Sequence, residues 1–272
     1  MELVGSDLVC TAGHDFPISK KGTVNVLTSG FRGSDGYDRD FFENRRIVFE
    51  AGYYDHVLEG VTALLEAHSE LRSVLDVGCG EGYYARRMLA ADPSRTVIGL
   101  DLSKEAVGVA ARGGNGVCWI VGDLAALPLR DGGVDVVLDV FSPARYDEFS
   151  RVLSSRGLLL KVVPGAKHLR ELRHAFKDVI RREEYSNQLV VDHFERHFEL
   201  VERISLTKTV ATSAAELRAF VRMTPLLFGV DELVADGRSV DAITVDAELL
   251  VGRPLLFKMP RRTAPPTPTA PA

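Results

Sequence analysis

Residues 74–84 read Val74-Leu75-Asp76-Val77-Gly78-Cys79-Gly80-Glu81-Gly82-Tyr83-Tyr84. An apolar strand ends in an acidic residue, three glycines follow at alternate positions, and a helix begins after them. Glycine is needed in such a loop because the backbone turns tightly and a bound ligand approaches it closely. The stretch therefore predicts a doubly wound α/β fold that binds a ligand at the turn after its first strand.

The spacing of the glycines distinguishes two classes of ligand. A loop that binds the pyrophosphate of a dinucleotide has the pattern Gly-x-Gly-x-x-Gly and holds the phosphates at the helix N-terminus. Here the pattern is Asp-x-Gly-x-Gly-x-Gly, with Asp76 before the first glycine and Glu81 inside the turn. Carboxylates at these positions would repel a pyrophosphate but suit a ligand with an ammonium and a sulfonium group. The pattern favours S-adenosylmethionine over NAD.

Two further strand ends carry chemistry that suits the same ligand. The run at 96–100 is followed by Asp101, which can accept hydrogen bonds from ribose hydroxyls. The run at 117–121 leads to Asp123 and Leu124, where an acid and a backbone amide can bind an adenine edge. These three strand ends resemble those of the class I methyltransferases. The predicted cofactor-binding residues are Asp76, Gly78, Cys79, Gly80, Tyr84, Asp101, Leu102, Asp123, Leu124 and Phe141.

The alternation of apolar runs and helical patterns predicts the layout of the whole chain. We expect a Rossmann-like, seven-stranded, mostly parallel sheet at residues 71–257, preceded by an N-terminal cap or lid at 1–70. The Pro-, Thr- and Ala-rich tail at 258–272 should be disordered. Predicted strands lie near 73–77, 96–100, 117–121, 134–141, 157–163, 198–210 and 242–251. Predicted helices lie within 38–66 and near 82–91, 103–112, 144–153 and 166–182, and a further one contains 216–221.

Composition limits the possible functions of the chain. Its 272 residues are 46% hydrophobic, yet no apolar run approaches the roughly 20 residues of a membrane span. The start lacks the features of a signal peptide, and three cysteines give no disulfide framework, so a cytoplasmic location is expected. The formal charge of −5 and the pI of about 5.8 argue against a polyanionic substrate without excluding one. A homodimer is compatible with this composition.

Several residues are candidates for the acceptor side of the site. The aromatic and arginine-bearing region at 41–54 could fold over the ligand mouth, with Tyr53 and Tyr54 closest to the donor. Open sheets bind ligands at the carboxyl ends of their strands, so Ser142, after the fourth strand, should face the substrate. Met223 ends a helix on the same side. Tyr54 and His168 are the candidate general bases, although His168 could equally form a structural hydrogen bond.

A metal site is not expected. Cys10 and His14 could supply two zinc ligands, but a closed structural site takes four, and the chain contains no Cys-x-x-Cys pair. We therefore predict no metal ligands and no bound zinc.

The assembled motifs resemble those of the bacterial 23S rRNA (guanine-N1) methyltransferases, including the tylosin-resistance type. The resemblance covers nearly the whole chain to about residue 255. It includes Cys10-x-x-x-His14-x-Phe16, Arg45-Arg46 through Ala51-Gly52-x-Tyr54, Leu75 through Tyr84, Gly99-Leu100-Asp101-x-Ser103-Lys104, Phe141-x-Pro143, Pro164-Gly165-x-x-His168-Leu169 and Met223-Thr224-Pro225. It implies a methyltransferase that uses S-adenosylmethionine and releases S-adenosylhomocysteine.

One departure from the family pattern bears on the substrate. Family members begin with a four-ligand zinc module that is thought to engage rRNA, and here only Cys10 and His14 remain of it. Together with the acidic balance, this predicts transfer of a methyl group to a ring carbon or nitrogen of a small heteroaromatic molecule, such as an indole of secondary metabolism. The alternatives are an rRNA methyltransferase that works without zinc and a non-catalytic binding protein that retains the fold.

Overall fold

The computed structural model describes residues 2–4, 7–10, 13–27, 37–112, 114, 116–180, 186–230 and 237–255. The tail that we predict to be disordered lies outside these residues. In the described part of the chain, no helix is long and apolar enough to cross a membrane.

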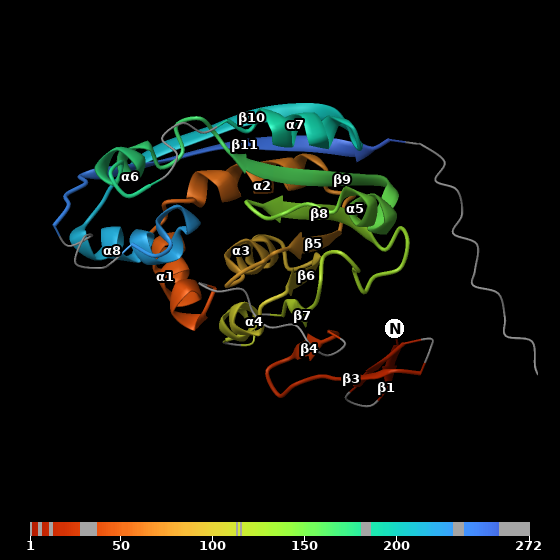
Figure 1. The fold of residues 1–272 in the computed structure, drawn as a ribbon. Coiled ribbons are helices and arrows are strands. Elements are labelled where there is room, and N and C mark those ends of the chain that lie inside the picture. Colours follow the sequence, from red (N-terminus) through yellow and green to blue (C-terminus); the bar gives the residue numbers. More distant parts are fainter. Residues whose placement is uncertain are drawn as a thin grey trace, which may run out of the picture.

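An eight-stranded sheet forms the centre of the fold, in the order β10-β11-β9-β8-β5-β6-β7-β4 (Figure 1). Only β11 runs antiparallel to its neighbours. The seven predicted strands are present, which confirms the predicted fold, and β4 from the N-terminal segment adds an eighth. The strands are β4 (Thr23–Asn25), β5 (Ser73–Val77), β6 (Thr96–Asp101), β7 (Cys118–Val121), β8 (Val134–Val140), β9 (Leu153–Pro164), β10 (Phe198–Ala211) and β11 (Ala242–Pro254).

Helices cover both faces of the sheet and form two buried apolar clusters with it. One cluster includes α1 (Arg39–Glu50), α2 (Asp55–Ala67), α3 (Tyr83–Ala91), α4 (Lys104–Ala110) and α8 (Ala214–Met223). The other includes α5 (Tyr146–Val152) and α7 (Gln188–Glu195). Successive residues of β5, Val74 and Leu75, belong to opposite clusters, as the alternation of side chains along a strand requires.

Helix α1 closes one end of the sheet together with α8, and the two lie side by side (Figure 1). The side chain of Asp38 caps α1 by accepting from the Phe41 backbone N–H at 2.8 Å. Arg222 of α8 pairs with Asp40 of α1 at 2.5 Å. A short 3-10 helix, η1 (Pro225–Leu227), follows α8. These elements lie over the carboxyl ends of the central strands, where the ligand site is expected.

The helix predicted for residues 166–182 is wrong over most of that range. Among the described residues of this range, 166–180, only α6 (Arg170–Ala175) is an α-helix, because backbone groups on both sides of it are held elsewhere. Before α6, Gly165 and Leu169 donate their backbone N–H groups to carbonyls of β11, at Asp246 and Thr244. After α6, the Arg238 guanidinium bonds the Ala175 carbonyl and ends the helix.

The N-terminal segment forms a small antiparallel sheet of β1 (Glu2–Val4), β2 (Asp7–Val9) and β3 (Asp15–Pro17) (Figure 1). Cys10 and His14 lie between β2 and β3, with Cys10 Sγ 3.4 Å from His14 Nδ1. Within the residues that the structure describes, no three His, Cys, Asp or Glu side chains are grouped so that they could hold a metal ion.

Candidate active site

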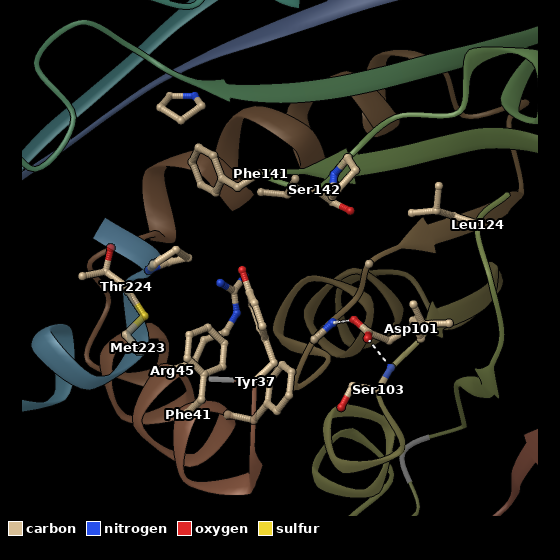
Figure 2. A pocket seen from close by; sticks show the side chains of 18 of the residues that line it. Tyr37, Phe41, Arg45, Asp101, Ser103, Leu124, Phe141, Ser142, Met223 and Thr224 are labelled. Atoms are coloured by element: carbon tan, nitrogen blue, oxygen red, sulfur yellow. Dashed lines mark hydrogen bonds between the residues drawn. The ribbon is translucent and has the colours of Figure 1, made fainter. Parts of the chain in front are cut away.

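A cavity of about 720 Å³ opens at the carboxyl ends of the central strands (Figure 2). Loops after β5, β6, β7 and β8 supply one wall. Helix α1, the end of α8 and the segment between β9 and α6 supply the other. The predicted site residues that line it are Tyr54, Gly78, Gly80, Asp101, Leu102, Asp123, Leu124, Phe141, Ser142, His168 and Met223.

The glycine loop forms the floor of the cavity. Gly78 and Gly80 have φ angles of 66° and 57°, in the left-handed region that glycine tolerates best. The backbone N–H of Gly78 donates to the Leu100 carbonyl at 2.8 Å, which ties the loop to the end of β6. The loop therefore presents backbone, rather than side chains, to a ligand.

Asp101 joins the glycine loop to the start of α4. One carboxylate oxygen accepts from the Gly80 backbone N–H at 2.9 Å, and the other accepts from the Ser103 N–H at 2.8 Å (Figure 2). Burial raises the pKa of this carboxyl, and the two backbone hydrogen bonds oppose the rise. Each carboxylate oxygen has a further lone pair, so Asp101 can accept from a ribose diol in the cavity while it holds the loop.

The loop after β8 contains a strained backbone position. Phe141 follows β8 with a φ angle of 53°, and Leu169 has a φ angle of 55° across the cavity. Such conformations of non-glycine residues cost on the order of 1–3 kcal/mol each and occur often at functional sites. The Phe141 ring centroid lies 5.3 Å from that of His168 and 5.9 Å from that of Tyr54. The structure thus brings both candidate bases beside the strained loop.

His168 is held as a neutral imidazole. Its Nδ1 lies 2.9 Å from the Asp246 carbonyl oxygen, which can only accept, so the proton is on Nδ1. Burial lowers the pKa of His168 to about 4, and the bond to Asp246 opposes the shift. In the described part of the chain, Nε2 has no hydrogen-bond partner. Its lone pair is available to a ligand.

Tyr54 suits a different role. Burial raises the pKa of its hydroxyl well above the usual value, and Arg45 opposes the rise only in part. The phenol therefore stays protonated at neutral pH. Its ring stacks on Phe49, with centroids 4.2 Å apart and planes inclined by 7°. Of the two candidate bases, only His168 has an unprotonated acceptor atom at neutral pH.

Four predicted site residues do not line the cavity. Asp76 and Cys79 are buried beneath the loop, where Asp76 is kept from water and its pKa is raised by burial and by Glu81. Tyr84 is directed into the core against Phe49. Tyr53 is fully buried, and its hydroxyl donates to Thr212 Oγ1 at 2.7 Å. We therefore assign none of the four a direct ligand contact.

Four other residues of the lining were not named as site residues from the sequence, although all but Tyr37 belong to the region predicted to fold over the ligand mouth. Arg45 and the phenylalanines of α1 have the spacing of ordinary helix packing, and Tyr37 precedes the helix. They are Tyr37, Phe41, Phe42 and Arg45. Their proximity to the glycine loop depends on how α1 packs against α8, which sequence spacing does not reveal.

A buried ion pair supports the loop after β8. Lys161 on β9 donates to Asp139 Oδ2 at 2.8 Å and to the Ser142 carbonyl at 3.0 Å. Burial raises the pKa of Asp139 to about 6, and the Lys161 ammonium opposes the rise. The ammonium fixes the carbonyl that follows the strained Phe141. The ion pair therefore links the core of the sheet to the loop after β8, which lines the cavity.

Comparison with known proteins identifies the family. A model described as a methyltransferase domain matches residues 74–157. YxjB of Bacillus subtilis is 34% identical over 260 residues, which is 91% of each chain. The 23S rRNA (guanine(748)-N(1))-methyltransferase of Streptomyces fradiae is 30% identical over 257 residues, again 91% of each chain. The chain belongs to the 23S rRNA (guanine-N1) methyltransferase family.

A solved structure supports the fold of this family member. This chain matches one from a solved complex of Haloferax volcanii, with a TM-score of 0.51 and 20% identity. That complex joins the Trm112 methyltransferase activator to a methyltransferase. The match covers 81% of this chain and 98% of that one. The protein is thus a class I methyltransferase that uses S-adenosylmethionine, as the sequence predicts.

The methyltransferase should depend on Asp101 for donor binding. Replacing Asp101 with alanine removes the carboxylate that we expect to bind the ribose, and it leaves the backbone N–H groups of Gly80 and Ser103 without their acceptor. We expect the dissociation constant of S-adenosylmethionine, measured by calorimetry, to rise roughly 30-fold or more. Glu105→Ala, which removes an exposed acid of α4 outside the lining, is the matched control. An unchanged affinity of Asp101→Ala would contradict the ribose assignment.

Proposed function

We propose that the protein transfers a methyl group from S-adenosylmethionine to N1 of a guanine in 23S rRNA. The kinship with a named guanine-N1 methyltransferase over nine-tenths of the chain supports this function better than our small-molecule prediction. The observation that carries it within the site is His168, which lines the cavity at the donor loops and whose Nδ1, rather than Nε2, is bound to the Asp246 carbonyl. Guanine N1 carries a proton that must leave when the methyl group arrives.

The geometry assigns a role to each wall in this reaction. The donor supplies an electrophilic methyl group on a sulfonium. Asp101 and the glycine loop hold the donor, while Phe141 and Tyr54 offer aromatic faces to a base turned out of its RNA strand. The N1–C bond forms as the C–S bond breaks, and the N1 proton passes to His168 Nε2. The products are N1-methylguanine and S-adenosylhomocysteine, and alignment within the cavity supplies much of the acceleration.

His168 should therefore affect turnover more than donor affinity. An asparagine at this position can still donate an amide N–H toward the Asp246 carbonyl but has no counterpart of Nε2. We expect His168→Asn to lower kcat roughly 100-fold. This is the low end of the range for general base catalysis, because an imidazole with a pKa of about 4 is a weak base. Donor affinity should stay within about twofold. An unchanged kcat would show that His168 has only a structural role.

The substrate can be tested directly. The protein is incubated with methyl-labelled donor and deproteinised 23S rRNA, and in parallel with a panel of indoles. We expect label in the RNA, and reverse transcription should stop at one guanine because N1 methylation blocks base pairing. Label in an indole together with unlabelled RNA would overturn the proposal. The Asp101→Ala variant shows whether the label depends on the donor site.

A specific observation keeps the small heteroaromatic substrate as a second candidate. Cys10 and His14 bond each other, and the part of the chain that the structure describes contains no metal-ligand group of the kind that a zinc module needs. The net charge of −5 also weakens attraction to RNA. An indole product in the parallel assay would favour this candidate, whereas donor binding without turnover on either substrate would favour a non-catalytic protein. An rRNA substrate would also place the protein in the cytoplasm.

A further inference from the structure

We propose that Arg45 binds the carboxylate of the methyl donor and makes the site selective for donors that carry this group. S-adenosylmethionine contains an adenosine, a sulfonium, an ammonium and a carboxylate. Asp101, at the end of β6, accounts for the ribose, and the acids buried beneath the glycine loop can attract the positive groups without contacting them. They leave the carboxylate without a partner, and a cation is needed close to the glycine loop.

Arg45 extends from α1 across the glycine loop. Its Nε lies 2.6 Å from Glu81 Oε2, and the guanidinium carbon lies 4.3 Å from the centroid of the Phe49 ring. A Cβ placed on Gly80 would be only 3.3 Å from Arg45 Nε, so the guanidinium lies directly over the loop. The side chain is 18% exposed, whereas that of Glu81 is 1% exposed. The buried Glu81 therefore fixes one side of the guanidinium.

The other side of the guanidinium is open to the cavity. Figure 2 shows the Arg45 side chain directed into the space between α1 and the loops after β6 and β8. In the part of the chain that the structure describes, the terminal nitrogens Nη1 and Nη2 have no hydrogen-bond partner. Two parallel N–H groups of a guanidinium match the two oxygens of a carboxylate. The side chain is thus preorganised for such a ligand.

The direction in which the donor lies supports this pairing. With the ribose at Asp101 and the adenine at Leu124, as we predict from the sequence, the amino-acid end of the donor extends the other way, over Gly80, and all three residues line the cavity. In that direction, Asp76, Glu81 and Asp101 gather negative charge. A free carboxylate would be repelled there unless a cation intervened, and Arg45 lies among these three acids. The acids attract the ammonium and sulfonium, while Arg45 balances the carboxylate.

The test compares two donors that differ only in the carboxylate. Affinities of S-adenosylmethionine and its decarboxylated form are measured by calorimetry for the wild type, Arg45→Gln, Arg45→Lys and the control Arg46→Gln, whose residue is exposed and outside the lining. We expect the wild type and Arg46→Gln to favour the carboxylated donor roughly 30-fold. In Arg45→Gln this preference should fall below about threefold, with Arg45→Lys in between.

The ratio of the two affinities separates ligand contact from structural support. If Arg45 only holds Glu81 and Phe49, Arg45→Gln weakens both donors alike and the preference survives, which would overturn the proposal. A wild type that binds both donors equally would also overturn it. So would a variant that loses RNA affinity but keeps its donor preference, because Arg45 would then serve the acceptor. Both donors are measured on the same folded fraction, so partial unfolding of a variant cancels in the ratio.

Discussion

Replacing Lys161 with methionine is expected to lower the free energy of unfolding by about 3–5 kcal/mol at neutral pH. The substitution keeps the length of the side chain but leaves Asp139 buried without its cation. Asp139 Oδ1 already has no hydrogen-bond partner among the described residues, so the carboxylate would lose its main stabilising contact. Chemical denaturation followed by circular dichroism measures the change. The Ser142 carbonyl also loses its donor, so turnover should fall with stability.

The dependence of this effect on pH has a definite sign. The pKa of Asp139 is already raised from 3.8 to about 6 in the folded protein, and loss of Lys161 removes the charge that opposes the rise. A carboxyl whose pKa is higher in the folded state favours folding when protonated, so stability is lost as the pH rises through the folded pKa. Lys161→Met should therefore be closest to the wild type near pH 5 and furthest from it above pH 7.

The double variant Asp139→Leu/Lys161→Met is the control for this prediction. It removes both charges, so no unpaired ion remains in the core, and most of the lost stability should return. Its unfolding free energy should not vary with pH in the manner of the single variant. If the single and double variants were equally unstable, the pair would act through packing rather than charge.

Replacing Gly78 with alanine is expected to abolish donor binding that calorimetry can detect. The φ angle of 66° is unfavourable for any residue with a Cβ, by about 1–2 kcal/mol. The new Cβ would also lie 2.8 Å from Ser142 Cβ and closer still to its Oγ, so either the glycine loop or the loop after β8 must move. A displacement near 1 Å can cost about 100-fold in rate, and here it acts on both walls of the cavity.

Removing the opposing side chain separates the clash from the backbone strain. In Gly78→Ala/Ser142→Gly the contact is gone while the unfavourable φ angle remains, so part of the donor affinity should return. Ser142→Gly alone measures any contribution that Ser142 makes to binding. Full donor affinity in Gly78→Ala would mean that the two loops are not packed as described.

The sequence predicts the centre of the sheet well because β5 and β8 are apolar runs that are buried on both faces. Strand β5 agrees with its predicted range at both ends, and α1 and α2 lie almost entirely within the predicted helical range 38–66. The failure at residues 166–182 has a physical cause outside the segment. Leu169 takes a left-handed conformation because its backbone N–H bonds Thr244, far along the chain, and local pattern carries no information on that contact.

The part of the site at the strand ends could be predicted more fully than the part that α1 supplies. Asp101 and the loop glycines lie at strand ends, where topology alone determines their place. Arg45 enters the cavity only because α1 packs against α8, a contact between distant parts of the chain. The importance of Lys161 and Asp139 could have been inferred from the sequence, since each is a charged residue within an apolar strand. A buried charge of this kind requires a partner.

The packing of α1 against α8 has a consequence for the order in which the protein matures. Helix α1 is among the first parts to leave the ribosome, whereas its partner α8 emerges only after the central strands have been made. Until then Phe41 and Phe42 lack the part of their cover that α8 supplies. The parallel strands from β4 to β9 all precede α8 in the chain, so they can pair before α8 completes the wall of the donor site.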